Sequence, residues 1–217
     1  MKRLVCLLCL LLAPHLARAD DIVVAVGLWI PPYVIEKEGR GIEYDILKES
    51  LAHAGHRMIA KYVPLARTLV ALKNGQVDGT MSTGRKDLPG CYTDPHITYW
   101  NFAITLRQRD LQIKDVKDLS KLSIIGFQNA RNYLGDAYFK MAEANSRYRE
   151  EADQRIQNKL LFRGRVDAVV ADRFIFQWFI NDPEVNRYAN TSQPVTYHKL
   201  FPPSEFSAVF RKEAHCT

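Results

Sequence analysis

The chain has 217 residues, of which 47% are hydrophobic and 25% are charged, as is typical of a globular protein. Its 30 basic and 24 acidic residues are scattered along the chain, so the net charge of +6 gives no reason to expect a nucleic-acid partner. No stretch of apolar residues is long enough to span a bilayer.

The first 19 residues have the pattern of a cleavable signal peptide. Residues 1–3 form a basic start, residues 4–12 an apolar core, and residues 17–19 a cleavage motif of the A-x-A type. We expect the mature chain to begin at Asp20 and to lie in the periplasm, with a net charge near +3 once three basic residues have left with the signal. The alternative is that the segment remains as an uncleaved anchor.

Strand and helix patterns alternate after the signal. A continuous β-branched run at 21–27 predicts a buried parallel strand. The two prolines within 29–33 predict a loop, because proline cannot donate a ladder hydrogen bond. The next patterns predict a helix at 41–52, a strand at 57–63, a helix at 66–73 and a strand at 77–81. This order is typical of a parallel sheet with right-handed crossovers.

The same order begins again in the second half. After an apolar run at 99–107 and a polar linker at 108–115, the patterns predict strands at 122–127, 166–171 and 206–210, helices at 132–144, 153–162 and 174–180, and a second linker at 191–195. The junction at 69–79 returns at 158–168: each has an apolar helix end, a Gly stop and a Val-Asp-small start of a strand. The repeat predicts two α/β lobes with a cleft between them, where small ligands bind.

The cysteines suggest one disulfide. Cys6 and Cys9 lie in the signal, so the mature chain keeps Cys91 and Cys216. An exported protein with two thiols is expected to join them, because its compartment is oxidising. The loop so closed would stabilise the fold by about 4–5 kcal/mol on the chain-entropy model. The alternative is two unrelated thiols.

Several motifs, in this order, resemble those of the extracytoplasmic solute-binding proteins of polar amino-acid ABC transporters (family 3). The matching motifs are Trp29-x-Pro-Pro-Tyr33, Gly41-Ile-Glu-Tyr-Asp45, Gly75-Gln-Val-Asp78-Gly, Met81-Ser-Thr83-x-Arg85, Tyr92-Thr-Asp94-Pro95, the segment 118–126 and the segment 164–172. No single motif is specific, but the ordered set is. The resemblance implies a two-lobed periplasmic binding protein fold of type II, α/β, with a mainly parallel sheet flanked by helices in each lobe. Lobe 1 is expected at 20–107 plus 196–217 and lobe 2 at 108–195, with hinges near 107–110 and 191–195.

The resemblance also implies a carboxylate site in lobe 1. In the family, an Arg just after the third strand holds the ligand's α-carboxylate, and Arg85 stands in that place. A guanidinium suits this role because its planar fork forms two charge-assisted bonds with a carboxylate. Ser82 and Thr83 would add hydroxyl and amide donors at the end of the strand. The alternative is a solvated Arg in a short charge run with Lys86 and Asp87.

Lobe 2 and the first loop would supply the remaining contacts. The family's Asp that accepts hydrogen bonds from the α-ammonium corresponds to Asp172, which could instead pair with Arg173 or cap a helix. Trp29 and Tyr33 correspond to the aromatic platform for the ligand's side chain, and either could instead fill the core. Tyr99 and Trp100 are expected to pack in the core or the hinge.

One departure concerns the turn at 126–132. The family has Gly-Thr-Thr or Gly-Thr-Ser there, whereas this chain has Arg131 in place of a hydroxyl. Arg131 would favour a more acidic ligand, or it would mean that the ligand is not an amino acid. His53 and His56 have no third ligand at metal-site spacing, so we expect no metal site.

The function implied is that of a monomeric periplasmic binding protein and not an enzyme. Closure of the hinge would bring Arg85 and Asp172 onto one small polar solute, an amino acid, which is then delivered to an ABC permease in the inner membrane. No cofactor and no nucleic acid are expected. Two alternatives remain: a ligand-sensing or orphan module of the same fold, and a periplasmic cyclohexadienyl dehydratase-like enzyme with Glu43 or Asp172 as the acid.

Overall fold

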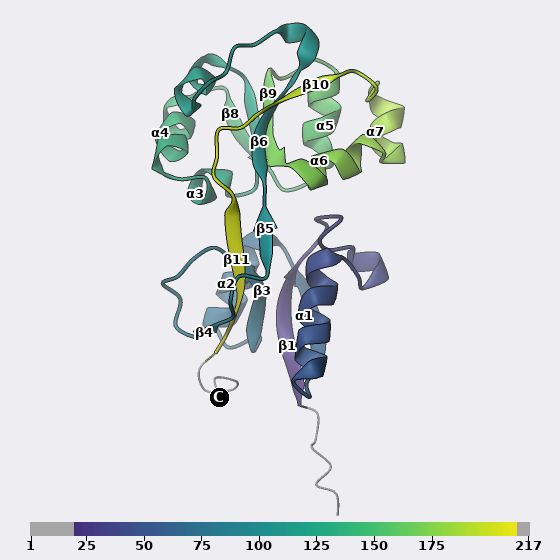
Figure 1. Cartoon of the computed structure of the whole chain (residues 1–217), viewed down its shortest axis with the longest axis vertical. Helices are drawn as coiled ribbons and strands as arrows, with labels where there is room; N and C mark the ends of the chain where they lie inside the picture. The colour runs from purple at the N-terminus through teal and green to yellow at the C-terminus, as the bar shows by residue number, and fades with distance from the viewer. Residues whose placement is uncertain (1–19, 212–217) are drawn as a thin grey trace, which may run out of the picture.

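The computed structural model describes residues 20–211, which form two lobes, each built on one β-sheet (Figure 1). The two-lobed α/β architecture expected from the sequence is therefore confirmed. The signal peptide expected at 1–19 and Cys216 lie outside the described residues, so the cleavage and the disulfide to Cys91 stay predictions. Among the described residues, no helix is both long and apolar enough to cross a membrane.

Lobe 1 consists of residues 20–99 and 204–211 around a six-stranded sheet. Its strands are β1 (Asp21–Gly27), β2 (Arg57–Val63), β3 (Gly79–Thr83), β4 (Cys91–Tyr92), β5 (Ile97–Tyr99) and β11 (Ser204–Phe210). Its helices are the 3-10 helix η1 (Glu36–Glu38), α1 (Ile42–His53) and α2 (Leu65–Lys73). The strand order is β2-β1-β3-β11-β4, with β5 also paired to β11. Strands β1, β2 and β3 are parallel, and β11 returns antiparallel to β3.

Lobe 2 consists of residues 101–198 around a five-stranded sheet of order β10-β6-β9-β7-β8. Its strands are β6 (Asn101–Leu106), β7 (Ile124–Phe127), β8 (Tyr148–Glu151), β9 (Ala168–Asp172) and β10 (Val195–His198). Its helices are the 3-10 helices η2 (Arg107–Arg109) and η3 (Val116–Lys121), and α3 (Ala130–Tyr133), α4 (Asp136–Ala144), α5 (Arg155–Phe162), α6 (Arg173–Ile180) and α7 (Pro183–Tyr188). Strand β7 is parallel to β8 and β9, whereas β6 is antiparallel to β9.

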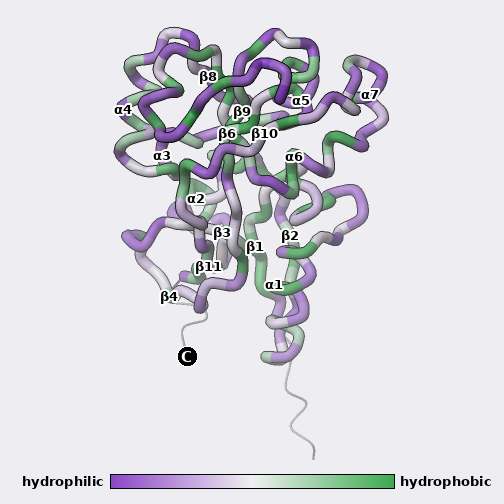
Figure 2. Tube along the Cα trace, turned by 45° about the horizontal axis from the view of Figure 1, so that its top comes forward, coloured by the Kyte–Doolittle hydropathy of each residue, from purple (hydrophilic) through white to green (hydrophobic). Residues whose placement is uncertain are grey.

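Apolar residues cover both faces of each sheet, as the continuous hydrophobic runs of the strands require. Neighbouring residues on a strand point to opposite faces. In lobe 1, Val24 packs in one core cluster and Ala25 in another, and in lobe 2 the same holds for Ile124 and Ile125. In Figure 2 the trace of β1 is accordingly drawn mainly in the hydrophobic colour.

The repeated junction has the same construction in both lobes. Gly75 and Gly164 follow α2 and α5 in left-handed conformation, with φ values of 66° and 62°, which glycine adopts without steric cost. Three residues after each Gly stands an aspartate that binds a neighbouring backbone: Asp78 Oδ2 accepts from the Val23 amide at 2.9 Å, and Asp167 Oδ2 from the Ser123 amide at 2.8 Å. The repeat therefore marks the point where each lobe fastens a helix end to its sheet.

The chain crosses between the lobes twice, at Trp100 and at residues 199–203. Figure 1 shows the crossings side by side, and β5 pairs with β11 next to them. The boundaries and hinges were expected near 107–110 and 191–195, so the first crossing lies earlier in the chain than expected and the second lies later. The difference arises because the apolar run at 99–107 is two strands: β5 belongs to lobe 1, whereas β6 pairs with β9 and β10 in lobe 2.

Candidate ligand-binding cleft

A cavity of about 70 Å³ lies between the lobes, lined by side chains of both. Its polar and charged lining comprises Thr68, Thr80, Ser82, Asn101, Gln154, Asp172 and Ser204. Its aromatic lining comprises Tyr99, Phe127, Tyr133 and Phe206. A groove of about 320 Å³ adjoins the cavity, since Tyr133, Ser204 and Phe206 line both. The cavity and the groove together form the candidate site.

Asp172 lies in the wall of the cavity at the end of β9, with 2% of its surface exposed. Its Oδ1 caps α6 by accepting from the amides of Phe174 at 2.8 Å and Ile175 at 3.1 Å, and its Oδ2 accepts from the Trp100 amide at 2.8 Å. Burial raises the pKa of Asp172 although these hydrogen bonds act to lower it. Asp172 thus lies at the cleft and also caps a helix, which was its alternative role; its expected contact with a ligand ammonium stays a prediction.

Tyr33 joins the two lobes instead of lining the cavity. Its hydroxyl donates a buried hydrogen bond to Asp172 Oδ1 at 3.1 Å, and its ring lies 4.4 Å from that of Tyr99. Burial raises the pKa of Tyr33, and the charge of Asp172 raises it further. Trp29 packs with Tyr33 against Ile175 and Phe179 of lobe 2. The loop expected to carry an aromatic platform thus contacts the other lobe.

The aromatic wall of the cavity comes from residues that the sequence did not single out as ligand contacts. The ring of Phe206 lies 5.1 Å from that of Tyr99 and 5.8 Å from that of Tyr133. Tyr99 was expected to pack in the core or the hinge, and it does so at the first crossing while also facing the cavity. The wall assembles only because β11 returns beside β5, which no local pattern shows.

Two side chains in the cavity are buried without a hydrogen-bond partner among the described residues. They are Thr80, whose Oγ1 is unpaired and which is 0% exposed, and Gln154, whose Oε1 is unpaired and which is 8% exposed. Buried polar atoms are normally hydrogen-bonded, and an unpaired one costs about 1–3 kcal/mol. Thr80 belongs to lobe 1 and Gln154 to lobe 2, and both residues line the cavity.

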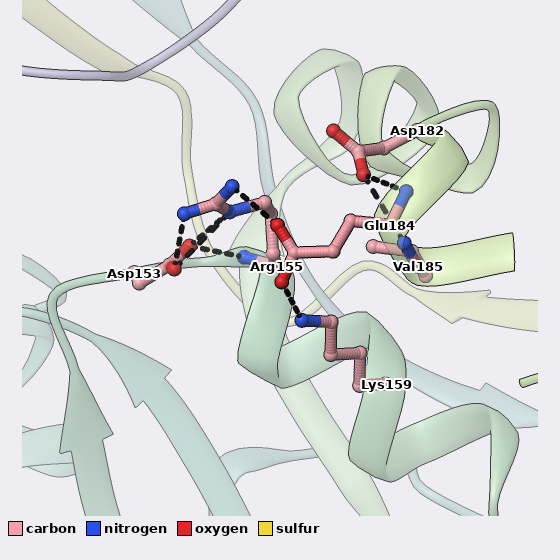
Figure 3. A network of polar contacts seen from close by, with 6 residues as sticks. All are labelled: Asp153, Arg155, Lys159, Asp182, Glu184 and Val185. Carbon is pink, nitrogen blue, oxygen red and sulfur yellow. Dashed lines mark hydrogen bonds and ion pairs between the residues drawn. The ribbon is translucent and has the colours of Figure 1, made fainter. Parts of the chain in front are cut away.

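The residues on either side of Gln154, Asp153 and Arg155, belong to a network of ion pairs in lobe 2 (Figure 3). Arg155, the next residue, binds Asp153 at 2.7 Å and Glu184 of α7 at 2.8 Å, and Lys159 also pairs with Glu184. The network fastens the start of α5 to α7. It therefore fixes the backbone from which Gln154 projects.

Arg85 lies in the adjoining groove and does not line the cavity. Its side chain is 47% exposed and donates two hydrogen bonds to Asp87, at 2.9 and 2.5 Å. These bonds lower the pKa of Asp87 to about 2. Ser82 lines the cavity, whereas Thr83 is buried and its Oγ1 accepts from the Arg85 amide at 3.1 Å. Arg85 is thus a surface residue paired with a member of its own charge run, and its expected contact with a ligand carboxylate stays a prediction.

Arg131 is bound by carboxylates of its own lobe and does not line the cavity. It forms ion pairs with Glu143 at 2.5 Å and Glu150 at 3.3 Å. The Glu150 carboxylate also accepts from the amides of Asn129 at 2.8 Å and Arg131 at 3.0 Å. Burial raises the pKa of Glu150, but the hydrogen bonds, led by the Arg131 amide, outweigh it, and the pKa lies below its ordinary value. Two amides of the turn at 126–132, those of Asn129 and Arg131, are thus occupied by Glu150.

Glu43 belongs to a separate buried cluster. Its Oε2 accepts from the Tyr99 hydroxyl at 2.7 Å, and its Oε1 lies 3.3 Å from His96 Nε2. Glu43 is fully buried and does not line the cavity, so its position gives no support to a role as a catalytic acid. Within residues 20–211, no group of three acidic, His or Cys side chains could hold a metal ion.

Comparison with known proteins bears on the fold. No protein-family model matches the sequence, and no curated protein sequence is similar to it. Solved structures do match. A histidine kinase sensor domain with similarity to periplasmic binding proteins matches with a TM-score of 0.73 and 17% identity, over 91% of this chain and 85% of the other. An ancestral arginine-binding protein bound to arginine matches with a TM-score of 0.68 and 20% identity, over 90% and 86%.

A further match has the same character. The amino-acid ABC transporter substrate-binding protein AbpA of Streptococcus pneumoniae, bound to L-arginine, matches with a TM-score of 0.64 and 16% identity, over 90% of this chain and 83% of the other. Identities at this level show the fold alone. The chain has the two-lobed α/β fold of the periplasmic binding proteins, and at the level of the fold its resemblance to the extracytoplasmic solute-binding proteins is confirmed.

Proposed function

We propose that the protein is a monomeric periplasmic solute-binding protein that closes its two lobes on a small polar solute, an amino acid, and delivers it to an ABC permease. The observation that carries this proposal is the cavity lined from both lobes, with the buried Asp172 carboxylate in its wall. Proteins with this fold whose structures contain bound arginine support it.

The chemistry of the cleft suits a zwitterion. Asp172 accepts one bond at Oδ2 from the Trp100 amide, which leaves acceptor capacity for a ligand ammonium. The Ser82 hydroxyl lies in the same cavity. Arg85 stands in the adjoining groove, and its pair with Asp87 is exposed, so the pair contributes little to stability. A ligand carboxylate can replace Asp87 at the Arg85 guanidinium, and it then gains the difference between the two pairs.

The test is thermal unfolding of residues 20–217 with the common L-amino acids, organic acids and polyamines. A ligand at a hundred times its Kd stabilises by about 2.7 kcal/mol, or roughly 5–10 °C in Tm for a chain of this size. Arg85→Ala should reduce the shift given by an amino acid, by no more than the loss of one exposed carboxylate contact allows. Arg57→Ala is the matched control, because Arg57 forms a similar exposed pair with Asp21 away from the cleft. A protein that melts cooperatively and responds to no compound would refute the proposal.

A second experiment separates delivery from sensing, since a sensor domain shares this fold. Deletion of the gene should abolish uptake of the radiolabelled ligand if the protein serves a permease. Normal uptake together with loss of a ligand-dependent transcriptional response would favour the sensory module.

A further inference from the structure

The polar lining of the cavity carries one negative charge, that of Asp172, and its remaining polar side chains are hydroxyls and amides that can accept as well as donate hydrogen bonds. Among the described residues that line it, Asp172 is the only charged one. Gln154 adds a buried carbonyl oxygen without a partner, and Thr80 a hydroxyl that can donate or accept. These groups are best satisfied by a ligand that brings N–H donors and a positive charge.

Another part of the lining is aromatic. Tyr99, Phe206 and Tyr133 form a continuous series of ring contacts at the cavity, 5.1 and 5.8 Å between centroids. The faces of aromatic rings attract cations, and the attraction is stronger where water is excluded. A carboxylate placed in the same cavity would be repelled by the Asp172 charge.

The groups that could bind a ligand carboxylate lie outside the cavity and are engaged within the protein. Arg85 pairs with Asp87, and the amides of Asn129 and Arg131 bind Glu150. The free energy of binding that a ligand carboxylate gains at such a group is only the difference between its own bond and the internal bond that it replaces. The carboxylate of an amino acid should therefore add little to the affinity.

We propose that the cleft selects its ligand through a cationic nitrogen that bears N–H donors, an ammonium or guanidinium group, held between Asp172, Gln154 and the aromatic wall, and that a carboxylate is dispensable. This inference rests on the proposed capture of a small solute in the cleft. One water needs about 10–15 Å³ of such space, so the cavity of about 70 Å³ accepts a head group of a few heavy atoms. The rest of the ligand lies in the adjoining groove. Small amines without a carboxylate are therefore ligands.

The first test uses matched compounds with the parent protein. Isothermal titration compares L-arginine with agmatine, L-lysine with cadaverine, and L-tyrosine with tyramine and with 4-hydroxyphenylpropionate. In the best-binding pair, the amine should bind within about tenfold of its amino acid. The acid without an amine should bind about a hundredfold more weakly or worse, because it leaves the buried acceptors unpaired.

The second test uses variants. Asp172→Asn removes the charge but keeps a side chain that caps helices well, and it should weaken binding of the amine by about ten- to a hundredfold. Asp182→Asn is the matched control: Asp182 caps α7 with the same pair of amide bonds and does not line the cavity (Figure 3). Gln154→Leu should weaken binding of the amine by about tenfold. If Asp172→Asn does not fold, Gln154→Leu and the compound series together test the inference.

The outcomes separate the two proposals. Binding of amino acids with amines more than about a hundredfold weaker would overturn this inference and leave the proposed function standing. Equal amine affinity in the Asp172→Asn and Asp182→Asn variants would also overturn it. If no compound binds, the proposed function fails, and this inference fails with it.

Discussion

Removal of the Tyr33 hydroxyl tests whether the bond between the lobes holds them together. The hydroxyl donates to Asp172 at 3.1 Å in a buried environment, and Tyr33→Phe keeps the ring that packs on Tyr99. A hydrogen bond to a charged group contributes about 1.5–3 kcal/mol. Asp172 keeps three amide donors in the variant, so we expect the lower end, about 1.5 kcal/mol.

A loss of this size should lower Tm by roughly 3–6 °C. Because the lost bond joins the lobes, the ligand-free variant should also have a larger radius of gyration in small-angle X-ray scattering and bind ligand up to about tenfold more weakly. Tyr188→Phe, at an exposed ring on α7, is the control and should change Tm by less than about 1–2 °C. A Tyr33→Phe variant with the parent's Tm, radius and affinity would refute the reasoning.

Two further predictions concern residues that shape the site. The pKa of Glu150 is lower in the folded protein than its ordinary value of 4.5. Its contribution to the free energy of unfolding is therefore present above pH 4.5 and is lost as the pH falls through the lower pKa of the folded state. Glu150→Gln should lower the free energy of unfolding by about 1–2 kcal/mol at neutral pH. Between pH 5 and 3 the Tm of the variant should fall less steeply than that of the parent, and parallel curves of Tm against pH would contradict this. Gly41→Ala would put a Cβ 2.2 Å from the Tyr33 carbonyl oxygen at a φ of +141°. The variant should lose about 1–3 kcal/mol of unfolding free energy, measured with urea, and should bind ligand more weakly. Gly55→Ala, at φ +84° with open space around it, should cost less, and equal losses would contradict the argument.

Strand β1 could be predicted because it lies inside its sheet, is buried on both faces and is therefore the continuous apolar run expected at 21–27. Strand β2 lies at the edge of the sheet and was predicted at 57–63 from its alternating pattern. Strand β8, with the sequence YREE, was missed: it lies at the edge of its sheet, where charged side chains reach water and hide the pattern. The helix expected at 132–144 is divided at Gly135, whose φ of 89° ends one helix before the next begins.

The cleft could be predicted only in part. Asp172 and Ser82 end strands whose carboxyl ends must face the other lobe, so their place follows from the strand pattern. Gln154 and Phe206 reach the cavity only through the packing of elements far apart in the sequence. The pairing of Glu150 with the amide of Arg131 depends on the register between β7 and β8. No spacing along the chain indicates it.

The return of β11 to lobe 1 has a consequence for the order in which the chain folds. Lobe 2 is one contiguous segment, residues 101–198, whereas the sheet of lobe 1 has β11 between β3 and β4. The inserted lobe can complete its sheet before β11 is made. Lobe 1 cannot, because its unfilled strand position stays open until β11 arrives, and unpaired strand edges of this kind promote aggregation. Lobe 1, whose first strand is made first, is therefore the last lobe to complete its sheet.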